Sequence, residues 1–488
     1  MHSESADKGG MMETNESVHS VLELIKTAKN IVVCAGAGIS TSCGLPDFRS
    51  KDKGLYNNLD AAALGIPSPE LLFDLEYFEL DPKAFFKFLP TLLTTVPEAA
   101  VAAAAGGLGG EEAQTACDIH PSSCHFFVKW LQAPGNSSSS SNGLRDDDTS
   151  RLLRVYTLNI DGLEKRAFST GAAGVAISAE ATAAVIVECH GNLTEFTCLR
   201  CRAGSSLGEL LACRGGGTDG AGTSVPEGGS RYELGSVFYC NKVTGYSDID
   251  SCHTATCGAV GVERRPQRAV SRARATSTSQ TSTGGTIFNR NLCNGVLKPN
   301  ILFFGEPFNA QYGSSRARSG TDGPPTKQRK KRLTISQMVK ADVCGACDCV
   351  LIMGMSFKVI SCIHDILRLN ARRGAHRVPV VYINNQLPSP ETLRQLNSFI
   401  EKADADITCS KANVTTKGSR TGRGLKRSRL VTTTVISFAP GTTPESAPLV
   451  STSVSITEGN IFDYILLGDA DFITGYIQNQ LSVKREKK

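Results

Sequence analysis

Long hydrophobic runs are missing from this sequence. No stretch of its 488 residues approaches the roughly 20 apolar residues that a membrane-spanning helix needs. The polar residues 1–17 lack the apolar segment of a secretory signal, and tandem repeats are not evident. We therefore expect an intracellular protein without a membrane partner.

Cysteine, by contrast, is present 17 times. In a chain without a secretory signal, thiols and metal ligands are expected more than disulfides. The net charge is only +5, and positive residues gather in three polar segments, at 263–274, 313–332 and 411–429. The basic runs 327–332 and 426–429, within two of these segments, favour nuclear import or nucleic-acid contact, and a solvated loop is the alternative.

A glycine-containing loop follows the apolar run 31–33. That run is typical of a buried parallel strand, and Gly36 and Gly38 would let backbone N–H groups approach a pyrophosphate. The stretch 44–50 is more specific, because it places a carboxylate, an aromatic ring and a guanidinium at residues 47–49.

These residues together resemble the sirtuins, the NAD-dependent protein-lysine deacylases. Further motifs follow in the family's order at 157–164, 190–192, 298–306, 354–356, 383–385 and 467–471. The segment 73–88 is similar to the branch that contains the nuclear histone deacetylases. The resemblance implies an α/β fold with a Rossmann-like parallel sheet, helices on both faces and a smaller zinc-binding and helical domain.

The apolar pattern agrees with a sheet that is buried on both faces. Further strands are predicted at 155–158, 185–187, 350–353, 378–383 and 464–467. We expect the Rossmann-like domain at 18–55, 151–192, 301–402 and 459–488, a helical cap at 56–134 and the zinc-binding domain at 193–300. Low-complexity composition predicts disorder at 1–17, 135–150 and 403–458, and in insertions at 99–110, 171–184, 203–230, 264–285 and 313–332.

His190 follows an apolar strand, at the edge where open α/β sheets place their ligands. A lone histidine is often structural, but beside this loop we favour a neutral imidazole acting as general base. The resemblance implies that His190 takes a proton from the nicotinamide ribose. It also implies that Asn159, the second catalytic residue, holds that ribose region and a water, and that Asp161 binds the nicotinamide amide. Turn chemistry at a strand end is the alternative for Asn159 and Asp161.

The resemblance implies further cofactor contacts. Phe48 would shield the reaction centre and Arg49 would meet a phosphate or ribose, with a surface turn as the alternative. Ser356 would contact a phosphate, Asn384 the adenosine ribose, and Ala470 the adenine. The predicted NAD site comprises Ala35, Gly36, Ala37, Gly38, Ser40, Asp47, Phe48, Arg49, Leu158, Asn159, Ile160, Asp161, His190, Gly354, Met355, Ser356, Asn384, Asn385 and Ala470.

Some positions depart from the family pattern, Ala35 and Leu158 among them. Ala35 stands where a threonine is common, and Leu158 stands where a glutamine usually hydrogen-bonds a ribose. An unpaired hydroxyl typically costs about 1–3 kcal/mol, or roughly 5- to 150-fold in binding or rate. We expect weakened catalysis or NAD affinity and not an inactive protein.

The motif that ends at residue 306 resembles one of two edges between which the family holds its acyl-lysine peptide as an added strand. The segment after Gly354 resembles the other edge. Backbone pairing of this kind gives affinity with modest sequence preference. A buried strand is the alternative for 301–304, and both can hold. The predicted substrate-binding residues are Ile301, Phe304, Gly305 and Glu306.

The sequence predicts part of a structural zinc site. Cys198 and Cys201 have the spacing of two thiolates in a tetrahedral site. The resemblance implies Cys293 as the fourth ligand, but Arg290 stands where its partner is expected and cannot ligate. The candidates for the remaining ligand are Cys257, which we favour, and Cys252 and Cys240.

The leading prediction is an NAD-dependent protein-lysine deacetylase that transfers acetyl from lysine to ADP-ribose and releases nicotinamide. NAD is then a co-substrate and Zn²⁺ is structural. Acetyl-lysine in histone tails is the expected substrate, and the nucleus, with the cytoplasm as a second place, is the expected location. The basic insertions could contact nucleic acid or an import receptor. A protein mono-ADP-ribosyltransferase and a weakly active, chromatin-associated scaffold that binds NAD or a peptide are the alternatives.

Overall fold

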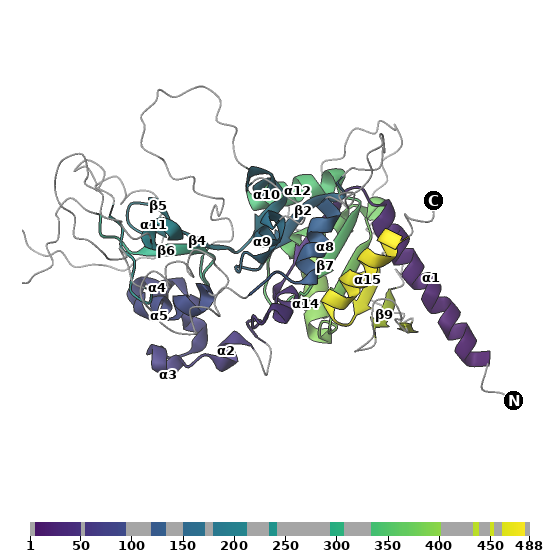
Figure 1. Cartoon of the computed structure of the whole chain (residues 1–488), viewed down its shortest axis with the longest axis horizontal. Helices are drawn as coiled ribbons and strands as arrows, with labels where there is room; N and C mark the ends of the chain where they lie inside the picture. Colours follow the sequence, from purple (N-terminus) through teal and green to yellow (C-terminus); the bar gives the residue numbers. More distant parts are fainter. Residues whose placement is uncertain are drawn as a thin grey trace, which may run out of the picture.

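The computed structural model describes residues 5–49, 54–93, 119–132, 150–170, 179–211, 234–241, 293–306, 333–401, 433–438, 449–452 and 461–483. These residues form a large α/β module and a smaller module beside it (Figure 1). No helix among them is both long and apolar enough to cross a membrane. The basic runs at 327–332 and 426–429 lie outside the described residues.

An eight-stranded sheet forms the centre of the large module. Its strand order is β10-β9-β11-β8-β7-β1-β2-β3, and all neighbours are parallel except β9 and β10. The order of the strands along the chain reverses between β1 and β7, which is where sheets of this kind bind ligands. The strands are β1 (Ile31–Ala35), β2 (Leu152–Thr157), β3 (Ile186–Glu188), β7 (Cys349–Met353), β8 (Val380–Asn384), β9 (Thr434–Phe438), β10 (Leu449–Thr452) and β11 (Tyr464–Leu467).

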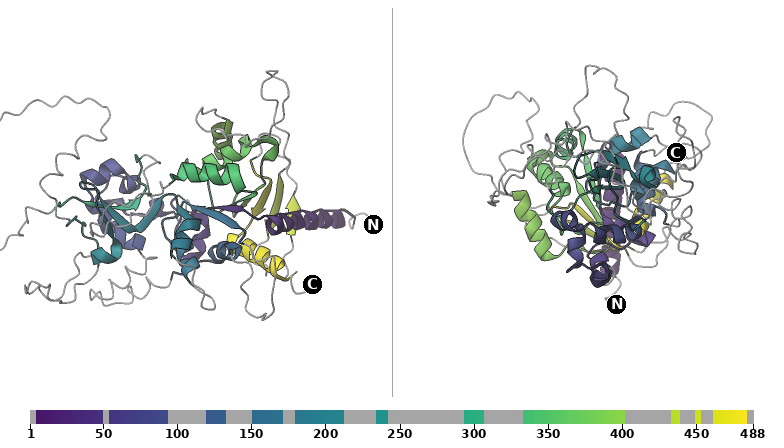
Figure 2. Two further views of the ribbon diagram at one scale, coloured as in Figure 1. Left: turned by 90° about the horizontal axis from the view of Figure 1, so that it is seen from above. Right: turned by 90° about the vertical axis from the view of Figure 1, so that its left-hand side faces the viewer.

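Helices cover both faces of this sheet, so consecutive residues of β1 face opposite cores. Ile31 and Val33 pack with α1 (Ser5–Thr27), α8 (Ser123–Gln132) and α15 (Ala470–Val483). Val32 and Cys34 pack with α12 (Ile335–Ala341), α13 (Cys362–Arg372) and α14 (Pro390–Glu401). Figure 2 shows α1 at the end of the molecule that lies farthest from the smaller module. The short elements are η1 (Ala37–Ile39), η2 (Thr41–Cys43), α9 (Leu163–Ser169), α10 (Ala179–Val185), η7 (Asp342–Ala346) and η8 (Gly374–His376).

The smaller module combines an antiparallel sheet with short helices. Its sheet has the order β5-β4-β6, from β4 (Gly191–Cys198), β5 (Gly204–Ser206) and β6 (Leu297–Ile301). The helices are α2 (Leu55–Asn58), α3 (Ala61–Leu64), η3 (Pro69–Phe73), α4 (Leu75–Leu80), α5 (Lys83–Leu92) and α11 (Leu207–Leu211). Aromatic residues are only 6% of the chain, yet they concentrate here. This phenylalanine core consists of Phe73, Phe78, Phe85, Phe86, Phe196, Phe238 and Phe303, with neighbouring ring centroids 5.0 to 6.3 Å apart.

The predicted fold class and the six predicted strands of the parallel sheet are confirmed. Several stretches that were expected to be disordered contain helices or strands among their described residues. β9 and β10 lie within 403–458, α10 lies within 171–184, and β5 and α11 lie within 203–230. The physical reason is that a neighbouring strand supplies hydrogen bonds: β9 pairs with β11, and its Val435, Ile436 and Phe438 are buried. The first helix begins at Ser5, within the expected disordered terminus.

The expected helical cap at 56–134 is divided between the modules. The helices α2 to α5 join the phenylalanine core, whereas α8 packs against α15 on the large sheet. The insertions at 99–110, 264–285 and 313–332 lie outside the described residues, as does 135–149.

Candidate functional site

A cavity of about 1160 Å³ lies at the reversal of strand order, between the loops that follow β1, β2, β3, β7 and β8. Most of the predicted NAD residues line it. They are Gly36, Ala37, Gly38, Asp47, Phe48, Arg49, Leu158, Asn159, His190, Gly354, Met355, Ser356, Asn384 and Asn385. Residues separated by hundreds of positions therefore meet at one edge of the sheet, as its topology requires.

Three glycines allow the loops after β1 and β7 to touch. The Gly36 N–H donates to the Met353 carbonyl at 3.0 Å, and the Gly38 N–H donates to the Gly354 carbonyl at 2.9 Å. A Cβ on Gly36 would lie 2.6 Å from the Gly354 oxygen, and a Cβ on Gly38 would lie 2.6 Å from the Gly354 Cα. The N–H groups of Gly36 and Gly38 are thus bonded within the protein, and the expectation that this loop brings backbone N–H groups to a pyrophosphate stays a prediction. The glycines are needed for close backbone packing.

His190 lies where the chain passes from the large sheet to the small one. Its carbonyl accepts a hydrogen bond from the Leu302 N–H at 2.8 Å. Burial lowers the pKa of His190 below its usual value, and a hydrogen bond with the Leu158 backbone raises it in part. The imidazole is therefore neutral at pH 7 and can accept a proton. The next residue, Gly191, has a φ of 78°, and its Cβ would lie 1.7 Å from the Asn300 oxygen.

A buried polar cluster lies behind the cavity wall. The Asn159 amide nitrogen lies 3.4 Å from the Ser40 hydroxyl, which donates to the Asp161 carboxylate at 2.8 Å. Burial and the nearby Glu164 raise the pKa of Asp161 to about 6. The fully buried His125 completes the cluster, with its ring within 4.8 Å of both carboxylates. Sequence analysis missed His125, whose signal is a lone histidine among apolar residues of α8.

Several predicted NAD residues do not line the cavity. Ala35 is buried at the end of β1, and its carbonyl accepts from the Leu158 N–H at 3.0 Å. Ile160 packs on the phenylalanine core, and Ala470 packs on the large sheet, although its neighbour Asp469 reaches the cavity. Ser40 and Asp161 belong to the buried cluster next to Asn159. Leu158 itself lines the cavity, so the departure from the family pattern lies at the site.

The aromatic and cationic residues after η2 lie at the edge of the cavity. Phe48 packs with its ring centroid 6.0 Å from those of Tyr56 and Phe73. The Arg49 guanidinium lies 5.5 Å from the Tyr56 ring and 5.9 Å from the Phe304 ring. Arg49 therefore joins the cavity to the predicted peptide-binding loop.

The predicted substrate residues differ in exposure. Phe304 is 41% exposed, but both of its backbone groups are bonded within the protein, to the Phe73 carbonyl at 2.8 Å and the Leu75 N–H at 3.0 Å. Ile301 is only 1% exposed, within the phenylalanine core. Gly305 is exposed, and the fourth residue, Glu306, is half-buried.

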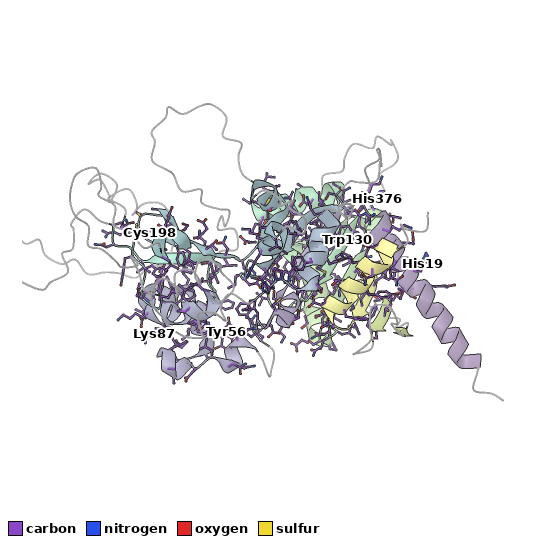
Figure 3. All side chains as sticks on the ribbon, in the orientation of Figure 1. His19, Tyr56, Lys87, Trp130, Cys198 and His376 are labelled. Atoms are coloured by element: carbon purple, nitrogen blue, oxygen red, sulfur yellow. The ribbon has the colours of Figure 1, made fainter. Side chains whose placement is uncertain are left out.

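Four cysteines of the smaller module form one cluster, and Figure 3 labels the first of them. The sulfur atoms of Cys198, Cys201, Cys240 and Cys293 lie within 4.8 Å of one another, with 3.6 Å in two of the pairs. Four converging thiols are the donor set of a closed, structural zinc site. Cys257 lies outside the described residues and Cys240 completes the set, so the preference for Cys257 is corrected.

Backbone pairing explains how Cys240 reaches the others. Its N–H donates to the Gly295 carbonyl at 2.8 Å, and its carbonyl accepts from the Asn294 N–H at 3.0 Å. Arg202 and Asn294, each directly after a cysteine of the cluster, have φ values of 60° and 51° that turn the chain back. A Cβ on Gly295 would lie 2.6 Å from a cluster sulfur. A sequence search for closely spaced pairs cannot find a ligand that is joined by such long-range pairing.

The chain is similar to proteins of one family. Residues 36–104 match the model of the Sir2 family. A Drosophila melanogaster protein, named NAD-dependent histone deacetylase sirtuin-1, is 27% identical over 389 residues, which are 79% of this chain and 31% of that protein. A Caenorhabditis elegans protein, named NAD-dependent protein deacetylase sir-2.1, is 36% identical over 184 residues, 38% of this chain and 22% of that protein. The chain thus spans less than a third of the length of either relative.

A comparison with solved structures also finds a Sir2 homologue, at low sequence identity. The crystal structure of a Sir2 homologue in complex with NAD has a TM-score of 0.43 and 14% identity. The match covers 96% of this chain and 94% of that chain.

Proposed function

From its similarity to the Sir2 family, we propose that the chain is a member of that family and an NAD-dependent protein-lysine deacetylase. It transfers acetyl from lysine to ADP-ribose and releases nicotinamide. The observation that carries this proposal is the neutral His190 in a cavity that Asn159 and Phe48 also line. Both relatives described above are named NAD-dependent deacetylases.

The cavity suits a dinucleotide in size and in chemistry. Ligand clefts commonly have volumes of about 300–1,000 Å³, and this one is slightly larger. His190 serves as the base for a ribose hydroxyl, because its ring is neutral and half-buried. Asn159 holds the adjacent ribose region, and Phe48 excludes water from it. Ser356 and Asn384 follow β7 and β8 at the same edge of the sheet, on the other side of the Gly354 contact, where the phosphates and the second ribose would lie.

The zinc ion has a structural role in this proposal. Cys198, Cys201, Cys240 and Cys293 would hold it, and none of the four lines the cavity. A closed set of four thiolates leaves no open position for a substrate, so the ion would stabilise the fold of the smaller module.

Acetylated histone tails and other nuclear proteins are the proposed substrates. The support is the name of the Drosophila relative, a histone deacetylase, and the basic run at 327–332, which favours nuclear import. The nucleus is accordingly the proposed location.

Leu158 favours one alternative function. Its apolar side chain lines the cavity where the family pattern has a hydrogen-bonding residue. A protein that binds NAD or a peptide on chromatin but turns over slowly is therefore the second candidate.

The proposal is tested with the purified full chain, an acetylated histone peptide and NAD. We expect nicotinamide and deacetylated peptide in equal amounts, and the loss of both in His190→Ala. The control is ADP-ribose binding by the variant, which should persist because the loops after β7 and β8 are untouched. Label transfer from NAD to protein without deacetylation would instead indicate an ADP-ribosyltransferase. Binding without any turnover would indicate the scaffold.

A further inference from the structure

Lys298 is a buried cation directly before residues 299–306, which we call the predicted peptide-binding loop. It is only 5% exposed, in β6. Its ammonium group donates to the Ile301 carbonyl at 2.7 Å and to the Pro299 carbonyl at 3.2 Å. It also lies 3.1 Å from the Glu306 carboxylate and 4.4 Å from the centre of the Phe303 ring. One ammonium group thus holds both ends of the loop 299–306.

Glu306 closes the far end of this loop. Its carboxylate accepts from the Phe303 N–H at 2.8 Å, and its own N–H donates to the Phe303 carbonyl at 3.1 Å. The resulting tight turn contains Gly305, which has a φ of 86°. In the part of the chain that the structure describes, neither backbone group of Gly305 is hydrogen-bonded.

These contacts limit which backbone groups of the predicted peptide-binding edge can pair with a peptide. Both backbone groups of Phe304 are bonded to η3 and α4, and both backbone groups of Phe303 are bonded to Glu306. Gly305 is therefore the residue of this edge whose N–H and carbonyl remain for pairing with an added strand. A buried ammonium remains charged only beside acceptors, so Lys298 depends on Glu306 as much as the turn does.

We propose that Lys298 and Glu306 are positioning residues, which hold the turn so that the backbone of Gly305 pairs with an incoming acetyl-lysine peptide. They act through Gly305 and do not contact the nucleotide cavity, which neither residue lines. The inference rests on the proposed function for the identity of its ligand.

The test measures the binding of a fluorescent acetyl-lysine peptide by anisotropy, separately from the binding of ADP-ribose. Glu306→Gln removes the charge but keeps the shape and an acceptor for the Phe303 N–H, and Lys298→Met removes the ammonium group at similar length. Losing one backbone pairing corresponds to about tenfold weaker peptide binding. ADP-ribose binding should not change. The control is Arg377→Met, which breaks an ion pair of 2.8 Å with Asp463 in the large module.

The possible results of this test distinguish a positioning role of Lys298 and Glu306 from a general structural role. Unchanged peptide affinity in a folded Glu306→Gln overturns the inference, as does an equal loss of peptide and ADP-ribose affinity, which a general structural role would produce. If Lys298→Met does not fold, Glu306→Gln carries the test. A wild-type chain that binds the peptide without turnover removes the proposed function but leaves the inference intact. A wild-type chain that does not bind the peptide overturns the inference.

Discussion

Gly354 is the position at which one added methyl group should damage the site most. Its φ is 62°, and a Cβ there would lie 2.5 Å from the Ile39 nitrogen and 2.7 Å from the Gly38 carbonyl carbon. Gly374 has almost the same φ, 60°, but no atom within 4 Å of its Cβ position. An alanine at Gly374 would therefore cause backbone strain alone, whereas an alanine at Gly354 would cause the same strain together with steric overlap.

The expected magnitudes follow from this comparison. Gly374→Ala should lower the free energy of unfolding by about 1–2 kcal/mol, the cost of the left-handed conformation for a residue with a Cβ. Gly354→Ala carries the same strain and adds overpacking, which typically costs about 1–3 kcal/mol. Its total is about 2–5 kcal/mol. Both atoms in its way belong to the backbone and cannot rotate aside, so the upper part of this range is expected.

Urea unfolding followed by tryptophan fluorescence provides the assay. Trp130 is the single tryptophan of the sequence, and it stacks on Phe127 in α8, against the large sheet. We expect the larger loss of stability in Gly354→Ala, together with weakened ADP-ribose binding that Gly374→Ala does not show. Equal unfolding free energies for the two variants, with normal ADP-ribose binding in both, would refute the role given to the close backbone contact.

The remaining predictions concern the zinc ion, the cavity and pH. Cys240→Ser should release zinc, counted by atomic absorption, whereas Cys257→Ser should retain it; the reverse result would contradict the cluster. Leu158→Gln should lower the KM for NAD by roughly 5- to 150-fold if the new amide reaches the ribose hydroxyl, and an unchanged KM would show that it does not. The pKa of Asp161 is raised to about 6, so its carboxylate becomes protonated and loses its negative charge as the pH falls through that value. Nicotinamide release should therefore decline below pH 6 and be constant from about pH 7 to 8; a rate that stays constant down to about pH 5 would contradict a role for the ionised carboxylate.

Much of the large module could be predicted because its strands are short, continuous apolar runs. Such runs occur at β1, β7 and β11, where both faces of the sheet are covered. β9 was missed because it lies in a Ser/Thr-rich stretch and owes its conformation to the hydrogen bonds of β11. Local composition cannot reveal a partner strand that lies elsewhere in the sequence.

Motifs at strand ends led to residues that line the cavity, as at Asn159 and His190. The close backbone contact at Gly36 was not predicted, because the loop that makes it lies more than 300 residues later in the sequence. Cys240 was a candidate ligand but not the favoured one, and His125 was missed, for a related reason: each lies beside neighbours that only the folded chain brings close.

The phenylalanine core of the smaller module is shared by two distant stretches of the chain, 54–93 and 191–306. Rings of one stretch pack on rings of the other, so the module depends on both stretches being held together. We therefore expect that opening of the smaller module exposes the rings of both stretches together and separates Gly305 from the nucleotide cavity while the large sheet stays folded.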